Sequence, residues 1–322
     1  MKNIPSCITA ILILLYCLSG CTKSNVNTTQ QINNQHAKYI GTWKGLVTDS
    51  LKSSTDTMTM AIYRLTDTSK LEGYVKFRNI VYKINENIYF GGINFSVINF
   101  APQCQTTSLT LNAVLENASL VLINFWGDNC DGNSLSVSGT LPMTSPTADL
   151  SNYLTFARKG HSWTWLVTNY DNTTCTYTYT MGKDYQNGVY KFTQANTCNW
   201  QNTSTIGWWY VSPQEWANMT DSLPVYRFTN FRTDAVIGTV YKKMIAQDSV
   251  VNTVESLNDN ITVNGQQYFC ARIHTQQWHT GSYIVNGLTW INYQVGFIKF
   301  ENLITTGPLS SVHYEELVSK NF

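Results

Sequence analysis

Residues 175–181 read Cys-Thr-Tyr-Thr-Tyr-Thr-Met, an unbroken alternation of larger side chains with threonine. Successive side chains of a β-strand point to opposite faces of the sheet, so this period of two predicts a strand with one buried face. Residues 109–115 and 135–141 show the same period, and turn signals such as Asn187-Gly188 and Asn264-Gly265 lie between such segments. Many short strands separated by turns predict an all-β chain of antiparallel barrels or sandwiches.

One short segment carries a helix signal instead. Ser212 is a typical N-cap, Pro213 occupies the favoured first helical position, and Glu215 completes a capping box. We therefore expect a helix of at most two turns between Ser212 and Met219.

The composition excludes some classes of function. The 322 residues include 21 Lys and Arg against 20 Asp and Glu, and charged residues make up 13% of the chain, whereas soluble domains carry about 25%. A net charge of +1 provides no basic surface for phosphates, so no nucleic-acid partner is expected. The 43% of hydrophobic residues indicate a folded chain with one or two cores.

The N-terminus has the pattern of a secretory signal. Lys2 precedes an apolar stretch from Ile8 to Leu18, which is shorter than the roughly 20 residues that span a bilayer. The stretch ends in Leu18-Ser19-Gly20-Cys21, which resembles the lipobox of bacterial lipoproteins. The resemblance implies a signal peptide over residues 1–20, lipid attachment to Cys21 and a membrane anchor through that lipid. The alternative is an ordinary signal peptide that is cleaved near Gly20.

The residues after the cysteine suggest a tether and a location. Residues 22–38 are rich in Thr, Ser, Asn and Gln, so residues 21–38 are expected to form a flexible tether. The composition resembles that of envelope lipoproteins of the Bacteroidota, in which acidic residues just after the cysteine favour export to the surface. Here the first acidic residue is Asp49. The resemblance therefore favours the periplasmic face of the outer membrane over the cell surface.

The cysteines fit an oxidising compartment, where pairing is the default. Two of the eight lie in the signal peptide and one is the lipidation site. Neighbours in sequence pair Cys104 with Cys130 and Cys175 with Cys198, each closing a loop worth about 3 kcal/mol. Cys270 is left over in a strand-like run, and we expect it to be a small core residue.

A boundary between two β domains is predicted at residues 142–149, where Pro142 and Pro146 interrupt the strand pattern. The first domain, 39–141, opens with Gly-Thr-Trp-Lys-Gly at 41–45, which resembles the first strand of lipocalin-like small barrels. The resemblance implies that Trp43 is a structural plug. The second domain, 150–322, is expected to be a larger β-sandwich or open barrel.

The second domain resembles secreted Bacteroidota domains of an uncharacterised family. Three segments carry the resemblance, at 160–165, 262–269 and 293–300, and Gln294 replaces a glycine of the family pattern. The resemblance implies a fold and no chemistry.

The aromatic residues Trp208, Trp209 and Trp216 are the candidate ligand site. Neighbouring residues of a strand face opposite sides, so at least one of Trp208 and Trp209 is a candidate for exposure. An exposed indole binds sugar rings or apolar ligands. The alternative is that the three side chains fill the core.

No catalytic residue, cofactor or metal site is predicted. The chain has no Gly-x-Ser-x-Gly motif, and its five histidines are scattered. A glycosidase needs two carboxyl groups, and the pool for them is Glu215, Glu255, Glu301, Glu315 and Glu316. Glu315 and Glu316 are expected to be exposed charges on an edge strand.

Two functions remain. The first is a membrane-anchored, non-catalytic binding or scaffold lipoprotein for a glycan or apolar ligand, with no protein partner indicated. The alternative is a hydrolase of glycans or lipids that uses a carboxylate pair.

Overall fold

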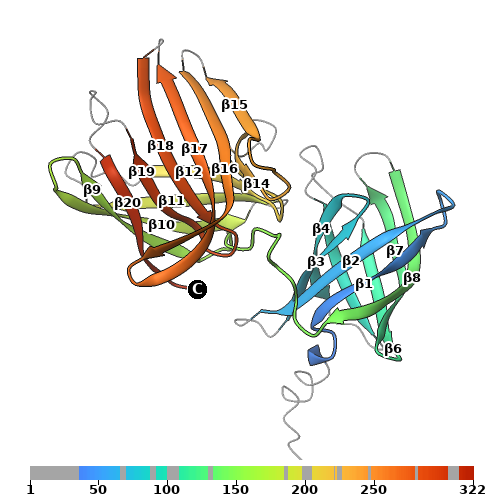
Figure 1. Cartoon of the computed structure of the whole chain (residues 1–322). Helices are drawn as coiled ribbons and strands as arrows, with labels where there is room; N and C mark the ends of the chain where they lie inside the picture. Colours follow the sequence, from blue (N-terminus) through green and yellow to red (C-terminus); the bar gives the residue numbers. More distant parts are fainter. Residues whose placement is uncertain are drawn as a thin grey trace, which may run out of the picture.

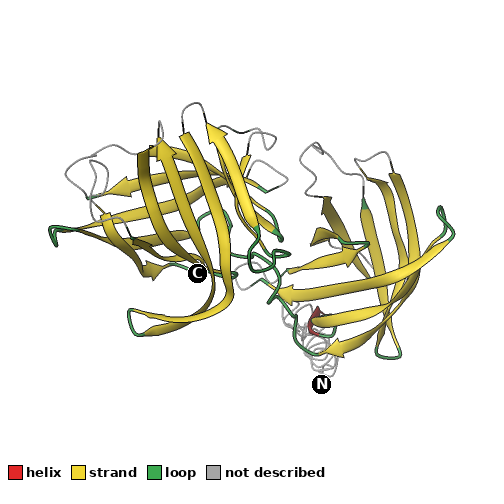
Figure 2. Cartoon of the chain, turned by 45° about the horizontal axis from the view of Figure 1, so that its top comes forward, coloured by secondary structure: helices red, strands yellow, loops and turns green. Residues whose placement is uncertain are grey.

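The computed structural model describes residues 36–65, 70–87, 92–99, 109–129, 133–184, 188–197, 205–220, 222, 227–245, 248–279, 282–303 and 312–322. These residues form twenty antiparallel strands in two sheets, and His36 and Ala37 are the only α-helical residues among them. Figure 1 shows the two sheets side by side, and Figure 2 shows that strands make up almost all of both. The predicted all-β fold of two domains is confirmed.

The first sheet is a closed barrel of eight strands in sequential order, with β1 paired to both β2 and β8. Its strands are β1 (Gly41–Asp49), β2 (Ser54–Arg64), β3 (Leu71–Phe77), β4 (Ile80–Asn87), β5 (Ile93–Asn99), β6 (Thr110–Glu116), β7 (Ser119–Asn129) and β8 (Asn133–Ser145). β8 continues past the predicted domain end at 141, with Pro142 opposite Ser119 at the start of β7.

Trp43 lies in the core of the first barrel. Its side chain is completely buried among the inward-facing residues of the other strands. The indole Nε1 donates a hydrogen bond to the carbonyl oxygen of Tyr39 at 3.0 Å, which satisfies the one polar group of the side chain. Trp43 thus has the structural role that was expected.

The second sheet contains twelve strands in the order β14-β13-β12-β11-β10-β9-β20-β19-β18-β17-β16-β15. The strands are β9 (Ser162–Asn169), β10 (Thr174–Asp184), β11 (Val189–Asn196), β12 (Thr205–Val211), β13 (Glu215–Met219), β14 (Arg227–Arg232), β15 (Val240–Ile245), β16 (Asp248–Val263), β17 (Gln266–His279), β18 (Ser282–Asn292), β19 (Gly296–Asn302) and β20 (Val312–Lys320). The first and last strands of the domain, β9 and β20, pair in the middle of the sheet.

The two edges of the second sheet are β14 and β15, which follow each other in the chain. The sheet curls on itself in Figure 1, so these edges approach each other and the domain is a nearly closed barrel. Residues 233–239 join the edges, and the backbone of Gly238 and Thr239 pairs with Val254 of β16. The concave face of the curled sheet therefore encloses the domain core.

The predicted helix at Ser212–Met219 is wrong, because these residues form the turn between β12 and β13 and then β13 itself. The N–H of Ser212 donates to the carbonyl oxygen of Glu215 at 2.8 Å, and Ser212 Oγ accepts from the N–H of Glu215 at 2.9 Å. The Glu215 carboxylate does not accept the hydrogen bond from the Ser212 backbone that a capping box requires, and instead pairs with Arg227 at 2.9 Å. A serine caps a turn through the same hydrogen bond that caps a helix.

The segment between β8 and β9, residues 146–161, packs against the first barrel. Tyr153 stacks on Tyr74 with ring centroids 4.8 Å apart. Arg158 Nη2 lies 2.5 Å from Glu72 Oε2 and donates to Tyr63 Oη at 3.1 Å. Aromatic and charged contacts therefore tie the second domain to β2 and β3.

The signal and tether predicted at 1–20 and 21–38 fall almost entirely outside the described residues, and Cys21 does so as well. Within the described part of the chain, no helix has the length and apolar character needed to cross a bilayer.

Candidate ligand-binding cavity

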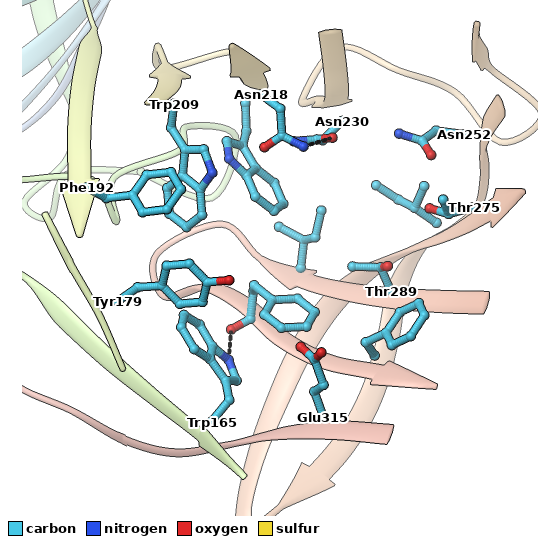
Figure 3. Close-up of a pocket in the computed structure, with 15 residues that line it drawn as sticks. Trp165, Tyr179, Phe192, Trp209, Asn218, Asn230, Asn252, Thr275, Thr289 and Glu315 are labelled. Atoms are coloured by element: carbon cyan, nitrogen blue, oxygen red, sulfur yellow. Dashed lines mark hydrogen bonds between the residues drawn. The ribbon is translucent and has the colours of Figure 1, made fainter. Parts of the chain in front are cut away.

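The concave face of the second sheet surrounds a cavity of about 400 Å³ (Figure 3). Eleven of the twelve strands, all except β15, contribute to its lining: Trp165, Tyr179, Phe192, Trp209, Trp216, Asn218, Asn230, Asn252, Ile273, Thr275, Thr289, Ile291, Phe297, Phe300 and Glu315. Asn218 and Asn230 come from one end of the sheet order and Asn252 from the other. The cavity thus depends on the curl that brings both ends of the sheet together.

Aromatic rings form one wall of the cavity. Trp165 of β9 contacts Tyr179 of β10 edge to face at 5.0 Å between centroids, and Tyr179 stacks on Trp209 of β12 at 5.9 Å. Phe192 lies 4.8 Å from Trp209, which in turn meets Trp216 of β13 at 5.4 Å. Every second side chain of a strand points to the same face of the sheet, so the aromatic residues of neighbouring strands lie side by side on the concave face.

Two glycines make room for rings of this lining. A Cβ on Gly207 would lie 2.1 Å from the ring of Phe192, and one on Gly287 would lie 2.4 Å from the ring of Phe300. Each ring therefore occupies the space that a side chain would fill on the neighbouring strand.

Glu315 is the one carboxyl group among the described lining residues. It lies opposite Phe300 of β19 and Val167 of β9, and Figure 3 shows it in the cavity below Thr289. Burial raises the pKa of the Glu315 carboxyl to about 7. The expectation of exposed edge charges was wrong for both Glu315 and Glu316, because β20 is an inner strand that pairs with β9 and β19 and both residues are half-buried.

The asparagines lie at the other end of the cavity in Figure 3. Asn218 Nδ2 donates to Asn230 Oδ1 at 3.3 Å. Three further polar atoms of this lining are buried and have no hydrogen-bond partner among the described residues, namely Trp216 Nε1, Asn230 Nδ2 and Asn252 Oδ1. Buried polar groups are normally paired, so this end of the lining contains two donors and an acceptor whose hydrogen bonds are not satisfied by the described residues.

The structure divides the predicted tryptophan platform. Trp209 and Trp216 are each only 8% exposed and line the cavity, whereas Trp208 packs with Val189 and Tyr210 in a separate cluster. The three indoles therefore do not share one surface, as the alternation along β12 requires.

The other predicted acids lie outside the cavity lining. Glu215 pairs with Arg227 at 2.9 Å, and Glu255 pairs with Arg272 at 3.2 Å. Glu301 and Glu316 lie 3.7 Å and 3.4 Å from Lys299 Nζ. Within the described ranges, no group of three or more His, Cys, Asp and Glu side chains is arranged to hold a metal ion.

The cysteines are described in part. Cys270 is fully buried in the core of the second domain and is a free thiol, as predicted. Cys175 is disulfide-bonded. Cys104, Cys130 and Cys198 lie outside the described residues, so the two pairings stay predictions.

Comparisons with known proteins add little to this geometry. No family model and no curated protein matches the chain. Among solved structures, a DUF3598-family protein of unknown function from Nostoc punctiforme aligns over 87% of this chain and 97% of that chain, with 8% identity and a TM-score of 0.22. A likeness at this level carries no information on the role of the chain.

Proposed function

We propose that this protein is a membrane-anchored envelope lipoprotein that binds a small, largely apolar ligand in the cavity of its second domain. The observation that carries the proposal is the aromatic cavity of about 400 Å³ with unpartnered buried polar atoms at one end. Ligand sites are concave, about 300 to 1,000 Å³ in volume and mostly apolar, with a few polar groups that orient the ligand.

Binding without catalysis is the form that we propose. A glycoside hydrolase of the carboxylate-pair type needs two carboxyl groups on either side of the bond that it breaks. The described lining has Glu315 alone, and the other acids of the pool pair with Arg or Lys elsewhere. These pairings favour a binding role over hydrolysis at this cavity.

The anchor and the location in this proposal rest on the lipobox resemblance at Leu18–Cys21 and on the absence of acidic residues between Cys21 and Asp49. Several acyl chains on one N-terminus hold a protein firmly on a membrane, since each buried CH₂ contributes about 0.8 kcal/mol. We place the protein at the periplasmic face of the outer membrane.

A neutral fluorescent probe tests the binding role. The full chain with Cys21→Ala avoids detergent, which would compete for N-phenyl-1-naphthylamine. Thr275→Trp fills the cavity from β17, and Gln276→Trp places the same side chain on the opposite face of that strand. We expect saturable probe fluorescence that Thr275→Trp removes and Gln276→Trp preserves. Equal probe binding by both variants would refute binding in this cavity.

A further inference from the structure

Glu315 differs from the other glutamates of the second sheet in having no hydrogen-bond or ion-pair partner among the described residues. Glu215, Glu255 and Glu316 each lie within 3.4 Å of an Arg or Lys nitrogen. No described residue donates a hydrogen bond to the Glu315 carboxyl, and the described lining contains no Lys or Arg. An acid that is surrounded by aromatic rings and lacks a counter-ion is costly in an empty cavity.

The aromatic rings that line the cavity with Glu315 also attract positive charge. Trp165 lies 5.0 Å from Tyr179 and 5.4 Å from Phe297 between ring centroids, and all three line the cavity with Glu315. The face of an aromatic ring carries negative potential and attracts cations. A carboxylate and several ring faces in one cavity therefore complement a positive charge.

On the outer face of the same sheet, an acid and an aromatic ring are both paired with a lysine of the chain. Lys299 Nζ lies 5.6 Å from the ring of Trp290 and 3.4 Å from Glu316 Oε1. Ring and acid share one lysine there. Inside the cavity, the described residues supply the ring and the acid but not the cation.

We propose that the ligand of this cavity is an organic cation, an ammonium group on an apolar body, with Glu315 as its counter-ion and the half-buried rings of Tyr179 and Phe297 around its charged end. This inference rests on the binding role proposed above and names its ligand class. The apolar body extends along the aromatic wall toward Trp209 and Trp216, which lie on the far side of Tyr179.

The ionisation of Glu315 agrees with this ligand class. Burial raises the pKa of the empty site's carboxyl to about 7, and a bound cation favours the carboxylate form. A quaternary ammonium ion does not titrate, so its binding at neutral pH releases a proton from Glu315. Tyr177 and Tyr179 of β10 interact electrostatically with Glu315, and burial raises the pKa of both phenols, so they stay neutral in this range.

Two probes of the same shape, one cationic and one neutral, measure how much the positive charge of a ligand contributes to its affinity for the cavity. Benzyltrimethylammonium and neopentylbenzene differ only in a cationic nitrogen and a neutral carbon, and each is titrated by calorimetry into the full chain with Cys21→Ala at about pH 8. We expect the cation to bind at least about tenfold more tightly than the neutral probe. Glu315→Gln is expected to remove this preference, so that the variant binds the two probes with equal affinity. Glu316→Gln, on the outer face of β20, is expected to preserve the preference for the cation.

The outcomes separate the two proposals. Equal affinity for the two probes, or a preference for the cation that survives Glu315→Gln, would overturn the cationic ligand. Binding of N-phenyl-1-naphthylamine in the cavity without binding of benzyltrimethylammonium would also overturn it and leave the binding role intact. Failure of all three probes to bind would overturn both.

Discussion

Glu315 and Glu316 are neighbours in β20, yet their carboxyl groups lie on opposite faces of the sheet. Glu316 Oε1 lies 3.4 Å from Lys299 Nζ on the outer face, whereas Glu315 lines the cavity. One strand thus carries a paired acid and an unpaired acid of identical chemistry. The two positions form a matched pair for experiments on the cavity.

The raised pKa of Glu315 predicts a pH-dependent stability. In the folded chain the pKa is about 7, above the ordinary value of 4.5, so the folded state binds the proton more tightly. The free energy of unfolding therefore falls as the pH rises through the window between these values, by at most about 3 kcal/mol. Tyr177 and Tyr179 of β10 stay neutral in this window, and Phe300 and Val167 carry no charge.

Glu315→Gln should accordingly increase the free energy of unfolding at about pH 8 and change it little at about pH 4.5, because the neutral amide has no charge to desolvate. Denaturant unfolding at the two pH values measures this difference. Glu316→Gln should stay within about 1 kcal/mol of the wild type at both, as for exposed ion pairs. An equal effect of Glu315→Gln at both pH values would contradict the burial of its charge.

The contact between Phe192 and Gly207 predicts a non-additive pair of mutations. The methyl group of Gly207→Ala would meet the Phe192 ring at 2.1 Å, so the ring must leave its place in the cavity wall. We expect a loss of about 1 to 3 kcal/mol for Gly207→Ala. Phe192→Leu in the same chain should recover part of this loss, and thermal unfolding of the four variants measures the coupling. Strict additivity would show that the ring does not rest on this glycine.

Cys270 should be unreactive in the folded protein. Its side chain is fully buried, and burial raises the pKa of its thiol to about 12, so little thiolate forms. Iodoacetamide at about pH 8 should label Cys270 only after unfolding in guanidinium chloride. Non-reducing peptide mapping of the same sample should find Cys104 with Cys130 and Cys175 with Cys198. A bridge that joins the two domains would refute both pairings.

The lipobox predicts where the protein is found after fractionation. Cys21→Ala removes the thiol that would carry the lipid, so the chain should move from the membrane pellet to the soluble periplasmic fraction. Mass spectrometry of the wild-type N-terminal peptide should find the lipid. Pelleting that Cys21→Ala leaves unchanged, with no lipid on that peptide, would refute the anchor.

The alternation of side chains was sufficient to predict an all-β chain, and Pro142 and Pro146 suggested its division into two β domains. The period along residues 175–181 gave the correct faces for Tyr177 and Tyr179, because it depends only on local geometry. The same rule separated Trp208 from Trp209. The signal at Ser212 failed because a serine cap serves a hairpin turn as well as a helix, and the pairing of β12 with β13 decided between them.

The cavity could not be predicted, because it depends on pairing between distant parts of the chain. Glu315 resembles an edge charge in the sequence, and only the pairing of β20 with β9 places it inside. Trp165 and Glu315 belong to those two strands at opposite ends of the domain sequence. The spacing of polar residues also gives no sign that Asn230 and Asn252 line the same cavity.

Site-resolved fluorine NMR tests the central claim most directly, with the full chain carrying Cys21→Ala labelled with 5-fluorotryptophan and single Trp→Phe variants assigning the resonances. On addition of N-phenyl-1-naphthylamine, the resonances of Trp165, Trp209 and Trp216 should shift, because these indoles line the cavity. The resonance of Trp208, on the opposite face of β12, should stay in place. A shift of Trp208 alone, or no shift of the three cavity tryptophans at saturating probe, would contradict a binding site inside the second sheet.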